Sequence, residues 1–436
     1  MKKSILIIAV LMFCLAACSP AVTAIPEAVT ATPKDVEISP NASIFSHPFP
    51  NHTAYAPGSI LPNHRTQTQL DDDVRAFYDY WKASYDIQDG TDAMGRPFYR
   101  IAFGKNAEAR ANTVSEGQGF GMLILPVMAG YDPEAQEIFD GLWLFARAHP
   151  SEVDARLMDW NIVKKEGNAS AFDGDADMAL GLLLADAQWG SQGEVNYIAE
   201  ADALLAGILE STIGPDSRLP MLGDWTDAYG NPHNQYTPRS SDFMLVNFRA
   251  YGKATGDPVW DEVLTNSQKV IFNLQETYSP KTRLLPDFII MSGEDHTPAP
   301  APAYFLESEN DGNFYYNAGR DPWRIGADAL LNNDAASRAA AQKISLWAES
   351  TTGGEPTSFR AGYDLDGKPL ENSDYFTTFF VAPLGVAAMT SPDQQEWLNS
   401  AYDAVYQTHE DYYADTVTLL CLITMTSNAW MPYSSN

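Results

Sequence analysis

The chain is poor in cysteine and in positive charge. It has 436 residues, only three of which are cysteine, and two of those lie close to the N-terminus. A framework of disulfides is therefore excluded, and the fold must be stabilised by packing alone. The 27 lysines and arginines stand against 57 aspartates and glutamates, which gives a formal net charge of −30. Such an acidic chain repels phosphates, so we expect no nucleic-acid partner.

Long apolar runs are also scarce. The single run that approaches the length of a membrane span lies at the N-terminus, which excludes a polytopic membrane protein. Hydrophobic residues nevertheless make up 45% of the chain and aromatic residues 12%. This content suffices for a large core, so most of the chain is predicted to fold. The ten tryptophans and 21 tyrosines suit either a large helical core or a surface that stacks on sugar rings.

The N-terminus has the pattern of an export signal. Two lysines precede an apolar stretch over residues 4–13, which is too short to span a bilayer permanently. The string LAAC that follows, ending at Cys18, resembles a bacterial lipobox. We therefore predict a signal peptide over 1–17, a lipid anchor at Cys18, and an extracellular or cell-surface location on a bacterial membrane. An ordinary signal peptide that is cut nearby is the alternative.

A segment rich in proline, alanine and threonine comes after this cysteine. From Ser19 to about Pro50 it shows no hydrophobic period, so we predict a disordered tether over 18–62. The remainder, 63–436, contains no further linker and is predicted to form one domain.

Helical periodicity recurs throughout that domain. Met178, Leu182, Ala185 and Trp189, for example, have the spacing of one helix face. About twelve such stretches pair through short connections, and no strand alternation of comparable length competes. The pattern predicts an all-α fold, most simply a closed toroid of paired helices. A solenoid and a bundle with appendages are alternatives, although no internal repeat supports a solenoid. The expected helix starts lie near 72, 115, 133, 175, 196, 240, 258, 322, 335, 374, 392 and 412.

Four segments gather acidic, glycine and aromatic residues. The first reads VSEGQGFGML and places Glu116 at the start of a helix whose glycines are expected to leave open space for a ligand. The second reads AFDGDADMALGLLLADAQW and places Asp173 at an expected N-cap. The third and fourth are aromatic, polar loops, DWTDAYGNPHNQYTPRSSDFM and YFLESENDGNFYYNAGRDPWRIGAD. Helix caps, first-turn acids and a self-packed loop are the structural explanations for these patterns.

The spacing of residues excludes a calcium loop, a dinucleotide-binding motif and a histidine metal site. The string DGDAD lacks the later glycine and glutamate of a calcium loop. The string GQGFG lacks the third glycine of a dinucleotide fingerprint. The seven histidines show no metal-binding spacing. We therefore expect neither a metal nor a cofactor.

Three strings together resemble glycoside hydrolase family 8. They are TVSEGQGFGML, DGDADMALGLLLADAQW and NAGRDPWRI, in the order found in the family. The resemblance covers the chain from about Asn63 to the end. It implies an (α/α)6 toroid, six helical hairpins with long loops around an open cleft, so that 63–436 would be the catalytic domain of an inverting, endo-acting glycosidase. Two positions depart from the family signature, because Phe172 replaces the usual Ser or Thr and Gly181 the usual Ser or Ala.

The resemblance also implies roles for individual residues. Glu116 corresponds to the general acid of the family, and Asp173 to the aspartate that contacts the sugar at the cleavage point. The usual base is the aspartate of a Y-D-A-x-R string, but this chain has Asn317 there, and an amide cannot take a proton from water. One branch of the family takes its base from an inserted loop with the string F-L-E. That string is present here, so Glu307 is the predicted base and Glu309 the less favoured candidate.

The same branch contains chitosanases and β-1,3-1,4-glucanases. The resemblance therefore implies a polysaccharide substrate, chitosan or mixed-linkage β-glucan, cleaved by a monomeric enzyme. The negative charge of the chain would favour approach of the polycation chitosan. A cellulase or xylanase of this family and an inactive glycan-binding lipoprotein are the alternatives, although a mere binder has no reason to keep both Glu116 and Glu307. The expected sugar-binding residues are Trp160, Trp225, Tyr304, Tyr316, Asn317, Arg320 and Trp323.

Overall fold

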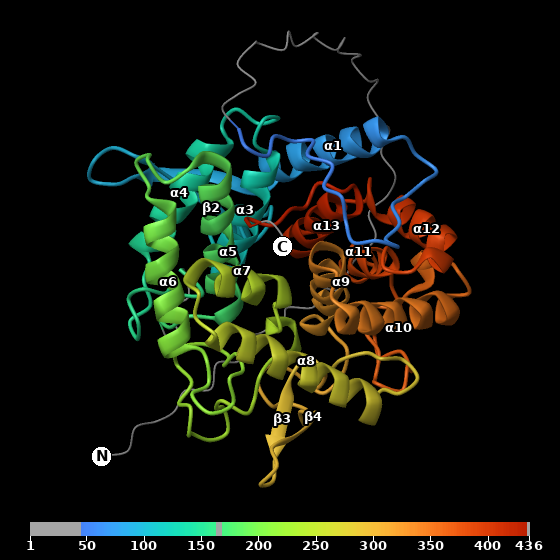
Figure 1. The fold of residues 1–436 in the computed structure, drawn as a ribbon. Coiled ribbons are helices and arrows are strands. Elements are labelled where there is room, and N and C mark those ends of the chain that lie inside the picture. Colours follow the sequence, from blue (N-terminus) through green and yellow to red (C-terminus); the bar gives the residue numbers. More distant parts are fainter. Residues whose placement is uncertain (1–44, 163–167, 434–436) are drawn as a thin grey trace.

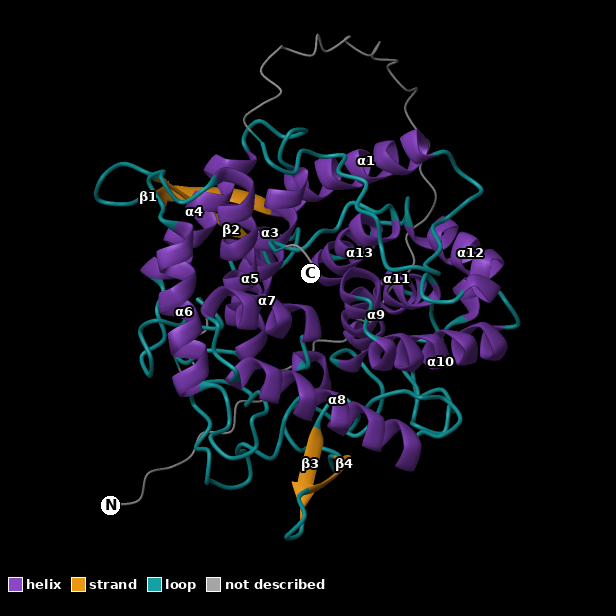
Figure 2. Cartoon of the chain, in the orientation of Figure 1, coloured by secondary structure: helices purple, strands orange, loops and turns teal. Residues whose placement is uncertain are grey.

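The computed structural model describes residues 45–162 and 168–433. Helices dominate this part of the chain, and the strands form two separate two-stranded hairpins (Figure 2). The hairpins are β1 (Asp86–Thr91) with β2 (Pro97–Ile101), and β3 (Ile289–Ser292) with β4 (Thr297–Pro300). The helices are α1 (Gln67–Tyr85), α2 (Ala107–Arg110), α3 (Ser115–Met128), α4 (Ala135–Ala148), α5 (Phe172–Trp189), α6 (Tyr197–Ser211), α7 (Leu245–Thr255), α8 (Val259–Thr277), α9 (Asp321–Asn332), α10 (Ala335–Thr352), α11 (Thr378–Ala388), α12 (Gln395–Val405) and α13 (Tyr412–Met425).

Twelve of the helices in the described ranges form two concentric layers (Figure 1). Helices α3, α5, α7, α9, α11 and α13 each contact the next, and α13 contacts α3 to close the inner ring. Helices α1, α4, α6, α8, α10 and α12 surround them. The chain alternates between the layers, so that successive helices pair as hairpins. The predicted (α/α)6 toroid is confirmed.

The two layers differ in how much of each helix is buried. Inner helices such as α5 and α13 are buried on nearly every side, whereas outer helices such as α8 and α12 bury one stripe and expose the other. An amphipathic stripe is what a helix between core and water requires. Met178, Leu182 and Ala185, which share the predicted face, are all fully buried in α5.

Two helices begin at residues other than the predicted ones, and neither has a side-chain N-cap hydrogen bond. Ala171 is the N-cap of α5, so Asp173 lies inside the first turn, and its prediction as the cap is wrong. Helix α7 begins at Leu245 rather than near residue 240, because Ser240–Asp242 form a short 3-10 turn first. In both places polar side chains contact other elements: Asp173 and Ser241 both accept hydrogen bonds from Arg320.

The inner helices meet at one mouth of the ring through their N-terminal ends. Arg320, which precedes α9, contacts Glu116 at the start of α3 and Asp173 at the start of α5. Phe379 at the start of α11 stacks on Tyr413 at the start of α13, with ring centroids 4.6 Å apart. The positive ends of several helix dipoles therefore converge, which favours carboxylates at this mouth.

Residues 45–62 form a strap across the opposite mouth. Backbone N–H groups of the strap donate to carbonyls at the C-terminal ends of five inner helices. Such carbonyls have no partner within their own helix. The pairs, donor first, are Ser46 to Gln188, Phe49 to Ala129, Thr53 to Ser427, Ala56 to Leu330 and Ile60 to Met389.

The strap shows that the last part of the predicted tether is folded. Phe49 is buried in the core, and the five hydrogen bonds fix the backbone, so residues 45–62 are part of the folded domain. The prediction of a disordered segment over 18–62 is therefore wrong for this stretch. The predicted signal peptide over 1–17, the lipidated Cys18 and the rest of the tether lie outside the described residues and stay predictions. No helix in 45–162 or 168–433 has both the length and the apolar character needed to cross a bilayer.

Truncation tests the strap. A chain that begins at Asn63 should melt about 10 °C or more below one that begins at Phe45, because it loses five capping hydrogen bonds of about 1 kcal/mol each and the burial of Phe49. The chain that begins at Phe45 is the matched control and should melt like the longer protein. Equal melting temperatures for the two truncated chains, measured by calorimetry, would show that the strap contributes nothing.

Candidate active site

The Arg320 guanidinium links the acidic residues at the mouth. Its Nη1 donates to Glu116 in a close ion pair and to Asp173 Oδ2 at 3.0 Å. Its Nη2 donates to Ser241 Oγ at 2.8 Å and to Asn317 Oδ1 at 3.2 Å. Arg320 is 1% exposed, whereas the Glu116 side chain is 17% exposed. Part of the Glu116 side chain is therefore open to solvent, while the arginine contacts it from the buried side.

A second arginine completes the cluster. Arg239 contacts Asp173 Oδ2 at 2.9 Å and Asp242 Oδ1 at 3.1 Å, and it donates to Asn317 Oδ1 at 3.3 Å. Asn317 in turn donates from Nδ2 to Glu307 Oε2 at 2.9 Å. Glu116 and Glu307 thus belong to one network in which Arg320 and Asn317 lie between the two carboxyl groups.

The environment separates the pKa values of the two acidic residues bound by Arg320. Burial raises the pKa of Glu116 to about 7, and the neighbouring Asp173 charge adds to the rise, although Arg320 opposes it. Burial acts on Asp173 in the same direction, but Arg239 and Arg320 outweigh it and lower the pKa of Asp173 to about 2. Near neutral pH, Glu116 can therefore hold a proton while Asp173 is ionised.

The loop that carries Glu307 is fixed by a buried carboxylate. It follows the β3–β4 hairpin, which extends beyond α8 (Figure 1). Asp311, 1% exposed, accepts the backbone N–H groups of Leu306, Glu307 and Ser308 at 2.7, 3.0 and 2.8 Å. Burial raises the pKa of Glu307, while Arg239 and the Asn317 amide oppose the rise. Glu309 is exposed and accepts only a long contact from Tyr304.

The predicted sugar-binding aromatics fall into two groups. Trp225 is 37% exposed and Tyr304 is 73% exposed. Tyr304 lies three residues before Glu307 in the same loop, and the Trp225 loop contacts that loop because His233 packs between Trp225 and Phe305. Trp160 and Tyr316 are half-buried. Their backbone carbonyls also accept structural hydrogen bonds, from Ser115 and Tyr413 respectively.

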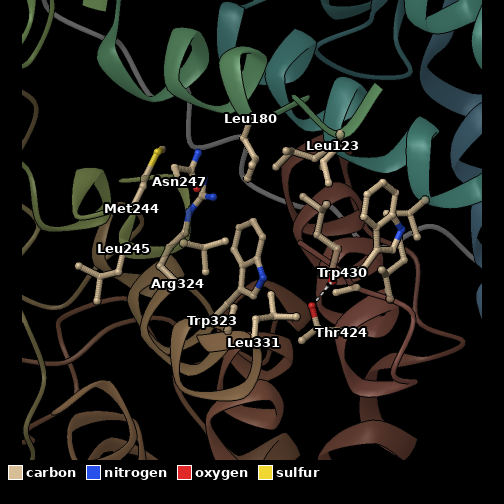
Figure 3. A pocket seen from close by; sticks show the side chains of 17 residues that line it. Leu123, Leu180, Met244, Leu245, Asn247, Trp323, Arg324, Leu331, Thr424 and Trp430 are labelled. Carbon is tan, nitrogen blue, oxygen red and sulfur yellow. Dashed lines mark hydrogen bonds between the residues drawn. The ribbon is translucent and has the colours of Figure 1, made fainter. Parts of the chain in front are cut away.

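Trp323 does not belong with these residues. It is 6% exposed, and the Arg324 guanidinium lies 4.2 Å from its ring centre. Its ring lines an apolar pocket between the inner helices, with Leu123, Leu331 and Trp430 around it (Figure 3). The structure places Trp323 in the packing of the ring, so its prediction as a sugar contact is wrong.

The glycines beside Glu116 serve packing rather than ligand access. A methyl group on Gly119 would lie 2.8 Å from the Gly174 carbonyl oxygen and 2.9 Å from Asp177 Cβ, and one on Gly117 would lie 2.7 Å from the Tyr412 hydroxyl. Helices α3 and α5 touch along this face, which brings Glu116 and Asp173 to the same arginine. The expectation that these glycines leave open space is therefore wrong.

The comparison with known proteins decides the family. The sequence pattern of glycosyl hydrolases family 8 matches residues 68–427. The chain belongs to this family. It is 40% identical to a beta-glucanase of Niallia circulans over 388 residues, covering 88% of this chain and 91% of that protein. It is 37% identical to an endoglucanase of Bacillus sp. strain KSM-330, covering 88% and 82%. The protein is therefore a glycosidase.

Solved structures of the family share the fold. The apo structure of a β-1,3-1,4-glucanase from Paenibacillus sp. X4 matches with a TM-score of 0.83 at 40% identity, covering 88% of this chain and 99% of that one. A cold-adapted family 8 xylanase matches with a TM-score of 0.66 at 19% identity, which shows the fold alone.

Several polar residues of this family 8 site were not predicted from the sequence. They are Arg239, Ser241 and Asp311, described above, and Asp287, which accepts hydrogen bonds from the backbone and the side chain of Asn317. Arg239 and Ser241 lie in the aromatic, polar string DWTDAYGNPHNQYTPRSSDFM, in which the sequence assigns a role to neither of them. Asp287 and Asp311 contact the site from loops with no regular pattern, and only the structure brings them together.

Substituting Gly119 tests the packing of α3 on α5. Gly119→Ala should lower the free energy of unfolding by about 2 kcal/mol, because its methyl group would meet backbone and Asp177 closer than atoms can approach. Gly193→Ala is the matched control, since nothing lies within 4 Å of a methyl group there, and it should change stability by less than about 0.5 kcal/mol. Denaturant unfolding of both variants measures the difference. Equal stability of the two would refute the packing role.

Proposed function

We propose that the protein is an endo-acting, inverting β-glucanase with Glu116 as general acid and Glu307 as general base. The observation that carries this proposal is the network in which Glu116, Arg320, Asn317 and Glu307 follow one another. In the same proposal the protein is held at a bacterial membrane surface through Cys18, with the cleft open to an extracellular polysaccharide.

Glu116 has the properties of the acid. Its raised pKa of about 7 lets it begin the reaction protonated and give that proton to the leaving oxygen. Asp173, with a pKa of about 2, stays ionised and is suited to hold a sugar hydroxyl or to stabilise the developing positive charge.

Glu307 has the position of the base. An inverting enzyme needs its two carboxyl groups about 6.5–9.5 Å apart, so that a water fits between the base and the sugar. Two side chains, Arg320 and Asn317, link Glu116 to Glu307, so the carboxyl groups are not in direct contact. Burial raises the pKa of Glu307, which makes it a better proton acceptor for the attacking water.

Mixed-linkage β-1,3-1,4-glucan is the proposed substrate. The support is the 40% identity to enzymes named beta-glucanase and β-1,3-1,4-glucanase over almost their whole lengths. Chitosan is the second candidate, because a chain with a net charge of −30 attracts a polycation. Exposed Trp225 and Tyr304 could stack on either sugar.

Comparative hydrolysis tests this assignment. Lichenan should give the highest kcat/KM among lichenan, chitosan, carboxymethylcellulose and xylan. Glu116→Gln should lose a factor of about 10²–10⁴ or more in kcat on that substrate while still binding it, because proton donation is lost. The rate of the unsubstituted enzyme should fall as pH rises above about 7, since Glu116 then loses its proton. A Glu116→Gln enzyme with half the normal rate would remove Glu116 from the role of acid, and the highest kcat/KM on chitosan would favour the second candidate.

Chemical rescue tests the base. Glu307→Ala should lower kcat by about 10²-fold or more, and added azide should restore part of the rate by attacking the anomeric carbon in place of water. The product should be the glycosyl azide of inverted configuration. Glu309→Ala is the matched control and should keep nearly full activity. A fully active Glu307→Ala together with an inactive Glu309→Ala would assign the base to Glu309 instead.

A further inference from the structure

Asp287 lies behind the proposed base and makes an unusual set of contacts. It is 2% exposed and has no ion-pair partner within 4.0 Å among the described residues. Its Oδ1 accepts the backbone N–H groups of Tyr315 at 3.0 Å and Ala318 at 2.7 Å. Its Oδ2 accepts the backbone N–H of Asn317 at 3.1 Å and the side-chain Nδ2 of Asn317 at 3.3 Å.

These contacts determine how the Asn317 amide is oriented. Its oxygen accepts from Arg239 and Arg320, while its nitrogen faces the carboxylates of Asp287 and Glu307. The opposite orientation would put N–H groups against two guanidinium groups and an oxygen against two carboxylates. An amide nitrogen has two N–H groups. Asp287 takes one of them, which aims the other at Glu307.

We propose that Asp287 is a positioning residue for the general base, acting through the Asn317 amide. This inference rests on the proposed role of Glu307. Asp287 does not touch the sugar or the reacting water; it fixes the donor that holds the ionised Glu307 carboxylate in place. Arg239, Arg320 and Asp311 are the other charged groups that act on Glu307, and none of them forms an ion pair with the Asp287 carboxylate.

The arrangement also explains why an amide suits position 317 once the base is Glu307. A carboxylate at 317 would meet the carboxylates of Asp287 and Glu307 where the Nδ2 group now donates. Like charges at hydrogen-bonding distance cannot all stay ionised. Asn317 supplies a donor to both carboxylates and an acceptor to both arginines without adding charge.

The pH profile of Asp287→Asn separates positioning from a general loss of structure. Without a fixed N–H donor, the ionised form of Glu307 is less stabilised, so the acid limb of kcat/KM should move to higher pH by about one unit. Asp287 and Glu307 also repel each other, so loss of the Asp287 charge without loss of the donor would move the limb to lower pH, and a shift in that direction overturns the proposal. We expect kcat at neutral pH to fall about 10–100-fold and KM to change less than about threefold. Asp140→Asn is the control, because this half-buried carboxylate lies in the outer layer, where it accepts a hydrogen bond from Tyr197 at 2.6 Å. This variant should have the same kcat at neutral pH and the same acid limb of kcat/KM as the unsubstituted enzyme.

A double-mutant cycle with azide distinguishes this proposal from the assignment of the base. In Glu307→Ala the azide-supported rate needs no base, so adding Asp287→Asn should leave that rate unchanged. The role of Asp287 would be overturned, with Glu307 still the base, if Asp287→Asn lowered the rate equally in the unsubstituted enzyme and in Glu307→Ala with azide. An acid limb of kcat/KM that Asp287→Asn does not shift would overturn it as well. A fully active Glu307→Ala would instead overturn the proposed function and this inference with it. If Asp287→Asn does not fold, Asn317→Ser removes the same donor and must show the same shift, and an unshifted limb in that variant overturns the proposal.

Discussion

The ion pairs of Arg320 are the interaction on which the rest of the site depends. A guanidinium that is almost fully buried requires carboxylate or carbonyl partners, since an unpaired buried charge is strongly unfavourable. Here the partners come from the starts of α3 and α5 and from the turn before α7. The contacts that join the helix starts at one mouth of the ring are therefore also the contacts that set the charge of the proposed catalytic groups. Stability and chemistry share the same atoms, so the helix packing around Arg320 tolerates little change.

The fold was predictable from the sequence because its helices obey a period. Burial of one face repeats along the outer helices, and the starts of the inner helices carry the acidic and glycine-rich strings that resemble the family. The strap was not predictable, because its proline-rich composition matches that of a disordered segment and its hydrogen bonds go to helix ends far along the chain. Trp323 was misassigned for a related reason: an aromatic residue beside a catalytic string looks the same whether it faces a sugar or Arg324.

The sequence supplies candidates for the reacting groups of the site but not the residues that orient them. Glu116, Asp173 and Glu307 lie in strings with a recognisable order, and the structure joins all three to one network. The residues that orient them follow no such order, since Asp287 and Asp311 act from irregular loops through backbone N–H groups. The glycines beside Glu116 were expected to leave space for a ligand, but the missing side chains can equally make room for a neighbouring helix. Only coordinates distinguish the two, and here Gly119 packs against α5 and Gly117 against Tyr412 of α13.

The strap has a mechanical consequence. The chain enters the domain at the mouth opposite the catalytic cluster, near Gln188 at the far end of the same helix that begins with Asp173. With a rise of about 1.5 Å per residue, those two ends of α5 are about 22 Å apart. Any pull applied to the chain ahead of residue 45 is therefore borne by a row of backbone hydrogen bonds spread over five inner helices. These hydrogen bonds all lie at the mouth opposite Arg320, so the proposed catalytic groups around Arg320 do not bear the load directly.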